Sequence, residues 1–176
     1  MFGSKVRVRL GRLDALAVAC DDSQSEFGEI LGAAITIQSM NRDAASKWQE
    51  TWTSQRSPPE GGWDWASIHD LSKRKTDEFC VAIWHEDTTL CGLFLLIVDG
   101  NSIRLKAIEG NPDENHPLKR YVLPIGIDVA ERLAEALERE EIWLVEPADG
   151  LLELYVNELK FELHEIDGKR ICKRRV

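Results

Sequence analysis

The chain has 176 residues, of which 43% are hydrophobic and 30% are charged. A chain of this length can bury most of the apolar surface that its unfolded state exposes, so we expect one domain, 1–176, around one core. The formal net charge of −9 argues against a protein that binds the phosphate backbone of nucleic acids. No apolar run reaches the roughly 18 residues of a membrane-spanning helix, and the N-terminus lacks the apolar centre of a signal peptide. We therefore expect a cytoplasmic protein that contacts no membrane.

The four cysteines stand alone in the sequence, without the CxxC pairing that is typical of zinc and redox sites. Cys80 and Cys91 each lie in an apolar, strand-like run, where a cysteine usually behaves as a small buried hydrophobe. The spacing therefore predicts neither a metal site nor a disulfide.

The N-terminal part begins with an alternation of apolar and basic residues over 6–10, which is typical of a half-buried strand. The segment from Asp14 to about Arg56 has few glycines and carries apolar residues at helical spacing up to Ile37, so we expect one or more helices there. SPPEGG, at 57–62, predicts a loop. Residues 66–73 have the pattern of a short helix.

Three apolar runs follow, FCVAIW, LCGLFLLIV and SIRLKAIEG, from Phe79 to Gly110. HEDTT joins the first two runs, and DGN, a strong hairpin signal, joins the last two. This pattern predicts three antiparallel strands in series.

The last third of the chain alternates helices and strands. Apolar residues from Val122 to Leu137 recur at intervals of three and four and predict a helix, which the short apolar strand EIWLV follows. LLELYVNELK predicts another helix, and FELHEI with RICKRRV predicts a hairpin that turns at Asp167 and Gly168. A strand, a crossover helix and a strand form a parallel pair, so the sheet should be mixed and the fold class α+β.

From Phe79 to Leu163 the chain resembles the GNAT superfamily of N-acetyltransferases. The resemblance depends on the order of a strand ending in AIEG, a basic loop, an amphipathic helix, a short strand and the segment LYVNELKF. It implies the acyl-CoA N-acyltransferase-like fold, an α/β sandwich with a mostly antiparallel sheet, a splayed central parallel pair and flanking helices. In this fold 76–176 would be the acetyl-CoA-binding core, and 1–75 a helical part that covers the acceptor side.

The resemblance also implies acetyl-CoA as co-substrate. Its pantetheine arm would lie beside the strand that contains Ala107 and Ile108. Its pyrophosphate would lie at the N-terminus of the next helix, against Lys119, Arg120 and Tyr121, because unpaired amide hydrogens and the helix dipole favour anions there. Small residues usually follow in this motif, and this chain has Leu123 and Ile125 in their place. Without the resemblance, the same residues predict only a loop with two solvated cations.

Two side chains are candidates for the chemistry that the resemblance implies. Tyr155 matches the tyrosine that protonates the departing CoA thiolate, although it equally fits an aromatic that packs between apolar neighbours. Glu109, at a strand end, is the candidate base that takes a proton from the acceptor amine, directly or through water. His116 is the rival base, because imidazole titrates near neutral pH. Lys160 stands where the family usually has glycine.

GGWDW is the candidate acceptor site. Trp63, Asp64 and Trp65 would hold a cationic amine with their ring faces and one carboxylate. The alternative is that the tryptophans pin a loop onto the domain.

These features predict an N-acetyltransferase that moves an acetyl group from acetyl-CoA to a primary amine by direct transfer. The alternative is a GNAT-fold protein that has lost catalysis and serves as a binding or regulatory module. A third interpretation is an unrelated interaction protein whose basic end, residues 169–175, contacts RNA or a partner. The helical N-terminal part is the expected place for a partner, such as a second copy in a homodimer, or for a lid.

Overall fold

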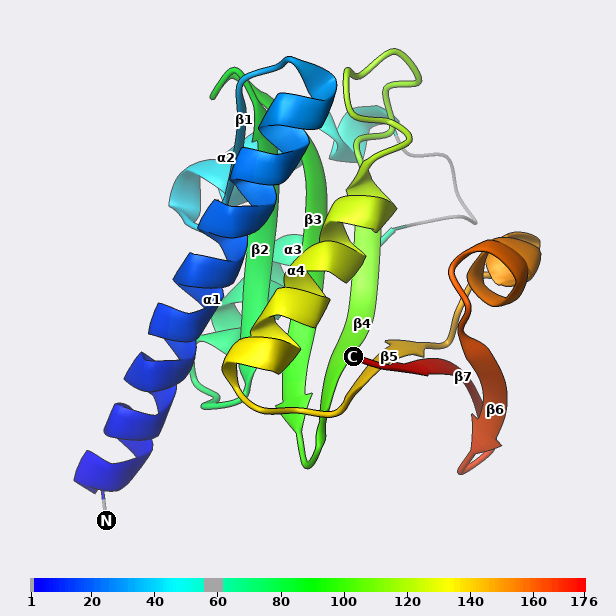
Figure 1. Ribbon diagram of the computed structural model, residues 1–176. Helices are drawn as coiled ribbons and strands as arrows, with labels where there is room; N and C mark the ends of the chain where they lie inside the picture. Colours follow the sequence, from blue (N-terminus) through cyan, green and yellow to red (C-terminus); the bar gives the residue numbers. More distant parts are fainter. Residues whose placement is uncertain (1, 56–61) are drawn as a thin grey trace.

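The computed structural model describes residues 2–55 and 62–176, and Figure 1 shows one central sheet with helices on both faces. The loop predicted at SPPEGG and the end of the predicted helical segment at Arg56 lie outside the described residues, apart from Gly62. The sheet has seven strands in the order β1-β2-β3-β4-β5-β7-β6. The strands are β1 (Ile35–Ser39), β2 (Glu78–His85), β3 (Thr89–Asp99), β4 (Ser102–Gly110), β5 (Glu141–Val145), β6 (Glu162–Ile166) and β7 (Lys169–Arg175).

Two helices cover each face of the sheet. The helices are α1 (Phe2–Leu31), α2 (Arg42–Thr51), α3 (Trp65–Ser72) and α4 (Val122–Ala136). In Figure 1, α1 and α4 lie in front of the sheet, and α2 and α3 lie behind it. Short 3-10 turns at Thr53–Gln55 and Asp149–Leu151 and a π-helical turn at Leu154–Glu158 complete the described helical segments.

The hydrophobic core is divided by the sheet. One cluster lies under α1 and α4 and includes Val81 and Ile83 of β2, and the other lies under α2 and α3 and includes Cys80 and Ala82 of the same strand. Successive side chains of a strand point to opposite faces, so a strand covered on both faces must be apolar throughout. This is why β2 and β3 appear in the sequence as unbroken apolar runs.

The predicted hairpins are confirmed. β2 pairs with β3, β3 with β4, and β6 with β7, all antiparallel. Gly100 in the DGN turn has φ of 55°, and the Asp167-Gly168 turn has φ values of 52° and 73°. Left-handed backbone at these positions matches the right-handed twist of the two strands that each turn joins.

The strand predicted at residues 6–10 is wrong, because these residues belong to α1. Val6, Val8 and Leu10 are 56%, 46% and 55% exposed, so their alternation does not mark a buried face. The segment instead continues a helix whose later turns bury residues at intervals of three and four, beginning at Leu16. Lys, Arg and Leu are good helix formers, so a short alternation does not oppose that continuation. The N-terminal end of α1 projects past the sheet in Figure 1.

A strand was also missed within the segment predicted as helical. Residues 35–39 form β1, which pairs antiparallel with β2 at the edge of the sheet, and Ile35 and Ile37 are buried on the same face. Gly32, with φ of 58°, ends α1 just before this strand. β1 joins residues 1–75 to residues 76–176 through one continuous sheet.

Candidate active site

The parallel pair of strands opens into a gap. β4 pairs with β5 from Ser102–Glu141 to Leu105–Leu144, and β4 then continues to Gly110 while β5 ends at Val145. Leu96 faces Leu105 and Leu95 faces Ala107, so Lys106 is an extra residue in β4. Such a β-bulge bends the strand that carries it. The bulge and the end of the ladder coincide, and beyond them the edge of β4 that faces β5 has no strand partner in the described chain.

A cavity of about 300 Å³ lies in this gap. Its wall includes Leu123 of α4 and Trp63, which precedes α3, so residues associated with both faces of the sheet line it. A two-sided cavity allows two reactants to meet from opposite faces. The described residues that line it are Trp63, Leu105, Lys106, Ala107, Ile108, Leu123, Leu144, Val145, Glu146, Pro147, Ala148, Leu151 and Tyr155.

Tyr155 lies in the π-helical turn and lines the cavity with only 4% of its surface exposed. Burial raises the pKa of its phenol, and the nearby Cys172 thiol adds to the rise. The phenol therefore stays protonated at neutral pH and can act as a hydrogen-bond donor or an acid. The Phe161 N–H donates to the Tyr155 carbonyl at 2.9 Å, and the Arg174 guanidinium lies 4.7 Å from the centre of the Phe161 ring.

The N-terminus of α4 lies beside the cavity. No side chain caps this end, its first turn carries no acid, and Lys119 and Arg120 just before it are exposed and make no ion pair with any described residue. Of the two bulky residues in the motif, Ile125 is fully buried in the core and Leu123 lines the cavity. Ile125 therefore does not cover the helix end. Pro124 has no N–H and the Tyr121 N–H donates to the Leu118 carbonyl at 2.9 Å, so the N–H groups left for an anion are those of Val122 and Leu123, beside the two cations.

Gly126 is a site residue that the sequence analysis missed. A β-carbon at this position would lie 2.8 Å from Ile108 Cδ1, so glycine lets α4 approach the bulged part of β4. Ile108 lines the cavity. A single glycine at a buried position of an otherwise amphipathic helix is a signal of close packing that the sequence offered.

The structure brings Glu109 together with the GGWDW segment. Glu109 Oε2 accepts hydrogen bonds from the Trp65 indole N–H at 2.7 Å and from the Trp63 backbone N–H at 3.2 Å. Trp65 is fully buried, whereas Trp63 is 45% exposed and lines the cavity. The two tryptophans therefore do not share one exposed face, and the half-buried Glu109 carboxylate lies behind the wall that Trp63 forms.

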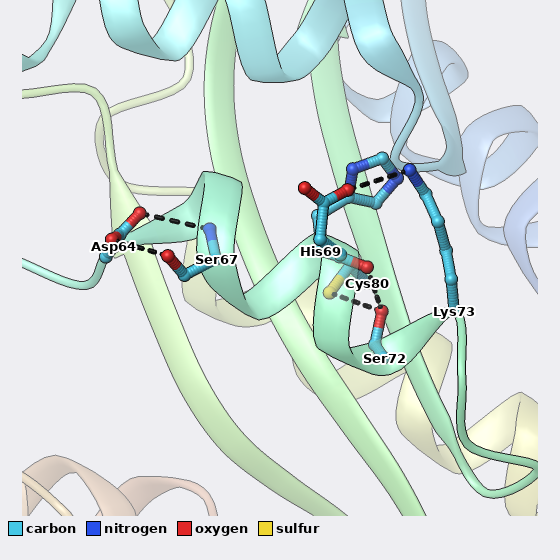
Figure 2. A network of polar contacts seen from close by, with 7 residues as sticks. Asp64, Ser67, His69, Ser72, Lys73 and Cys80 are labelled. Carbon is cyan, nitrogen blue, oxygen red and sulfur yellow. Dashed lines mark hydrogen bonds and ion pairs between the residues drawn. The ribbon is translucent and has the colours of Figure 1, made fainter.

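Asp64 has a structural partner in α3. Figure 2 shows its carboxylate at the helix N-terminus, where it accepts hydrogen bonds from the Ser67 N–H at 3.1 Å and the Ser67 hydroxyl at 2.7 Å. At the other end of α3, the Cys80 thiol of β2 donates to the Ser72 hydroxyl at 3.5 Å, and this hydroxyl donates to the His69 carbonyl at 2.9 Å (Figure 2). The Asp64 cap fixes the first turn of α3, where Trp65 lies, and the Cys80–Ser72 contact joins the other end of α3 to β2.

His116, the rival base, lies elsewhere. It is 6% exposed, its Nδ1 has no hydrogen-bond partner within residues 2–55 and 62–176, and it is not among the residues that line the cavity. Its Nε2 would lie 3.8 Å from a β-carbon at Gly110, near Val122 of α4. Burial lowers the pKa of its imidazole, and Asp113 opposes part of this effect. This position is on the α4 side of β4, opposite to the face on which Glu109 binds Trp65.

Within the described ranges, no three His, Cys, Asp or Glu side chains are arranged to hold a metal ion. Over the same residues, none of the helices combines the length and apolarity needed to cross a membrane.

Comparison with known proteins gives structural matches only. No protein-family model matches the sequence, and no curated protein matches it. The PaiA N-acetyltransferase from Thermoplasma acidophilum, solved in complex with coenzyme A, has a TM-score of 0.54 and 16% identity over 81% of this chain and 99% of that chain. A GNAT-family acetyltransferase from Staphylococcus aureus Mu50 has a TM-score of 0.58 and 17% identity, again over 81% and 99%.

A third match is the dodecameric spermidine N-acetyltransferase from Vibrio cholerae, with a TM-score of 0.53 and 14% identity over 81% of this chain and 92% of that chain. At such identities the likeness concerns the fold, and it covers nearly the whole length of each of these proteins. The seven-stranded mixed sheet, the bulged β4 and the gap beside β5 lie within a chain that has the fold of the GNAT acetyltransferases.

Proposed function

We propose that the protein is an N-acetyltransferase that moves an acetyl group from acetyl-CoA directly to a primary amine. The observation that carries this proposal is the cavity between β4 and β5, which has an unpaired strand edge on one side and the buried Tyr155 phenol on the other. The PaiA structure in complex with coenzyme A and the spermidine N-acetyltransferase supply the precedent for both reactants in this fold.

The described residues fit acetyl-CoA. The β5-facing edge of β4 beyond Leu105 offers N–H and C=O groups that a pantetheine arm can pair with, as an added strand would. Ala107 and Ile108 lie on this edge. The N-terminus of α4 with Lys119, Arg120 and Tyr121 would bind the pyrophosphate through amide hydrogens and charge.

The proposed chemistry balances with Tyr155, which lines the cavity, and Glu109, which lies behind the Trp63 wall. Acetyl-CoA supplies the acetyl group as a thioester. Glu109 takes a proton from the acceptor ammonium, directly or through water, and the freed nitrogen attacks the carbonyl carbon. A backbone N–H of β4 stabilises the negative charge that develops on the carbonyl oxygen. The N–C bond forms as the C–S bond breaks, and Tyr155 gives its proton to the leaving sulfur.

Three further points stay predictions. Residues 76–176 would bind acetyl-CoA, and residues 1–75 would cover the acceptor side, to which Trp63 belongs. A cationic acceptor is favoured by the net charge of −9. The helical N-terminal part is the place predicted for a partner, such as a second copy in a homodimer, or for a lid.

The experiment compares two acetyl donors by calorimetry and by thermal shift. Acetyl-CoA carries phosphates and S-acetylpantetheine does not. The double variant Lys119→Met, Arg120→Met should therefore weaken acetyl-CoA binding by about 10²-fold. The affinity for S-acetylpantetheine should stay within about twofold. Glu114→Gln, in the same loop, is the matched control that changes charge without removing a cation. If acetyl-CoA does not bind the unaltered protein at millimolar concentration, the proposed function is wrong. Binding without release of CoA across a panel of primary amines would instead support the catalytically inactive alternative.

A further inference from the structure

Among the described residues that line the cavity, two side chains carry full charge at neutral pH, Lys106 and Glu146. Glu146 is already paired, because its carboxylate lies 3.1 Å from the Lys169 ammonium. Lys106 is exposed, and no ion pair joins it to another residue in the described parts of the chain. The uncompensated charge among these described lining residues is therefore positive, in a protein whose net charge is −9.

Arg104 of the same strand shows how such a cation is otherwise accommodated. Its guanidinium lies 2.7 Å from the Asp99 carboxylate and 4.3 Å from the centre of the Trp143 ring. Lys106 has no comparable partner among the described residues, although it occupies the bulge at which β4 leaves β5. The bulge thus places an ammonium group at the cavity, where an anionic group of a ligand can pair with it.

The residues predicted to bind a cationic acceptor are mostly directed elsewhere. The Asp64 carboxylate caps α3, and Trp65 is fully buried against Glu109. Only Trp63 of that group lines the cavity, and it supplies an aromatic wall without a charge.

Lys106 and Glu109 together suggest what the acceptor carries. They are three residues apart on one strand, a rise of about 10 Å, and the lysine stem can span part of this distance. Glu109 is the proposed partner of the reacting amine. An acceptor with an acidic group near its amine would pair that group with Lys106 and reach Glu109 through water, because Lys106 lines the cavity and Glu109 lies behind Trp63. The CoA phosphates have their own cations at the N-terminus of α4.

We propose that Lys106 is a specificity-determining residue that binds the carboxylate of an amino-acid acceptor, so that amino acids are acetylated in preference to amines that lack the carboxylate. This inference rests on the proposed N-acetyltransferase function. It departs from the cationic acceptor that composition alone favours, because the charge at the cavity differs in sign from the charge of the whole chain.

The test uses pairs of acceptors that differ by one carboxylate: L-phenylalanine with phenylethylamine, L-norleucine with pentylamine, and L-lysine with cadaverine. With saturating acetyl-CoA, CoA release should give a kcat/KM about tenfold higher for the amino acid than for its amine partner in at least one pair. Lys106→Met should bring this ratio close to one, and Lys106→Glu should invert it. Arg104→Gln, which removes a nearby cation that is already paired, is the control and should keep the ratio. Where no pair of acceptors turns over, the amino acid and its amine partner are compared by their dissociation constants from the protein–CoA complex.

A preference for the amine partner in every pair, or an unchanged ratio in Lys106→Met, would overturn the inference and leave the proposed function standing. A loss of acetyl-CoA affinity in Lys106→Met with no change in the ratio would overturn it too, by assigning Lys106 to the cofactor. Failure of acetyl-CoA to bind the unaltered protein would instead refute the proposed function, and the inference with it.

Discussion

At the scale of single residues, Tyr155 is both a core residue and the proposed acid. It is buried in the core cluster beneath α4 and also lines the cavity. Burial raises the pKa of the phenol above its ordinary value of 10.0. A group that holds its proton through the neutral range can donate it to a thiolate without titrating first.

Tyr155→Phe removes the phenolic hydroxyl, with its proton, and keeps the aromatic ring. We expect kcat to fall by about 10²-fold, while the dissociation constant of acetyl-CoA stays within about twofold. Steady-state kinetics and calorimetry measure the two quantities. Unchanged kcat would show that Tyr155 serves packing alone, and would leave acetyl transfer itself untouched.

The backbone of Lys160 has a conformation that destabilises the folded protein locally. Its φ is 59°, in the left-handed region that a β-carbon disfavours, and the GNAT resemblance expects glycine here. Lys160→Gly should therefore raise the free energy of unfolding by about 1 kcal/mol, as measured by urea denaturation.

Lys160→Ala is the matched control for this change. Alanine keeps the β-carbon and removes the ammonium group that donates to the Asn157 carbonyl at 2.5 Å. It should give no gain in stability. Equal gains from both variants would attribute the effect to the ammonium group rather than to the backbone.

At the scale of elements, the approach of α4 to β4 determines the shape of the cavity. Gly126 on the helix and Ile108 on the strand are in contact at the point where a β-carbon would come within 2.8 Å of Ile108 Cδ1. Because Ile108 Cδ1 is the far end of a side chain, it can move, and the cavity that it lines changes with it.

Gly126→Ala should weaken acetyl-CoA binding by about tenfold, because Ile108 must leave its rotamer. The free energy of unfolding should change little, because alanine gains about 1 kcal/mol of helix propensity that offsets the strain. Ile108→Val removes Cδ1, so the double variant Gly126→Ala, Ile108→Val should recover most of the affinity. Calorimetry measures the affinities. No recovery in the double variant would show that the contact between these two residues is not the cause.

At the scale of the whole molecule, the sheet separates two cores, and each core holds one buried histidine. His69 lies on the α3 side and His116 on the α4 side. Burial lowers the pKa of both imidazoles below the ordinary value of 6.5. In the unfolded chain both rings take up a proton at a higher pH than they do in the folded protein.

The folded protein should lose stability as the pH falls below about 6.5. Above that pH both imidazoles are neutral in the folded and the unfolded state, so they do not make stability depend on pH. Below it the unfolded state binds more protons than the folded state, and stability falls until the pH has passed the lower pKa values of the folded protein. Urea unfolding at about pH 7.5 and about pH 5 measures the loss. His69→Gln and His116→Gln should each make the loss smaller, and the double variant should reduce it further. An identical loss in the double variant would assign the acid sensitivity to other groups.

The sequence alone determined the strands from β2 to β5, α4 and the β6–β7 hairpin. In these segments the apolar period and the turn residues are local signals: DGN and Asp167-Gly168 adopt the left-handed backbone that their turns require. The parallel pairing of β4 with β5 followed from the crossover through α4. The order of these elements was also enough to predict the acyl-CoA N-acyltransferase-like fold, and the solved structures of GNAT acetyltransferases share that fold.

The tertiary structure decided what local patterns could not. Residues 6–10 have a strand-like alternation, but they form part of the first turns of α1. This helix packs on α4 and β1 through its later turns, which carry its buried residues. β1 lies within the segment predicted as helical. It has five residues, and this length is too short for a strand periodicity to be recognised in the sequence. Two contacts join residues that are distant in sequence: Trp65 with Glu109, and Gly126 with Ile108. Lys106 differs, because its charge matters through the lack of an ion-pair partner among the described residues. Such relations exist only once the chain has folded, because distance along the chain does not determine distance in space.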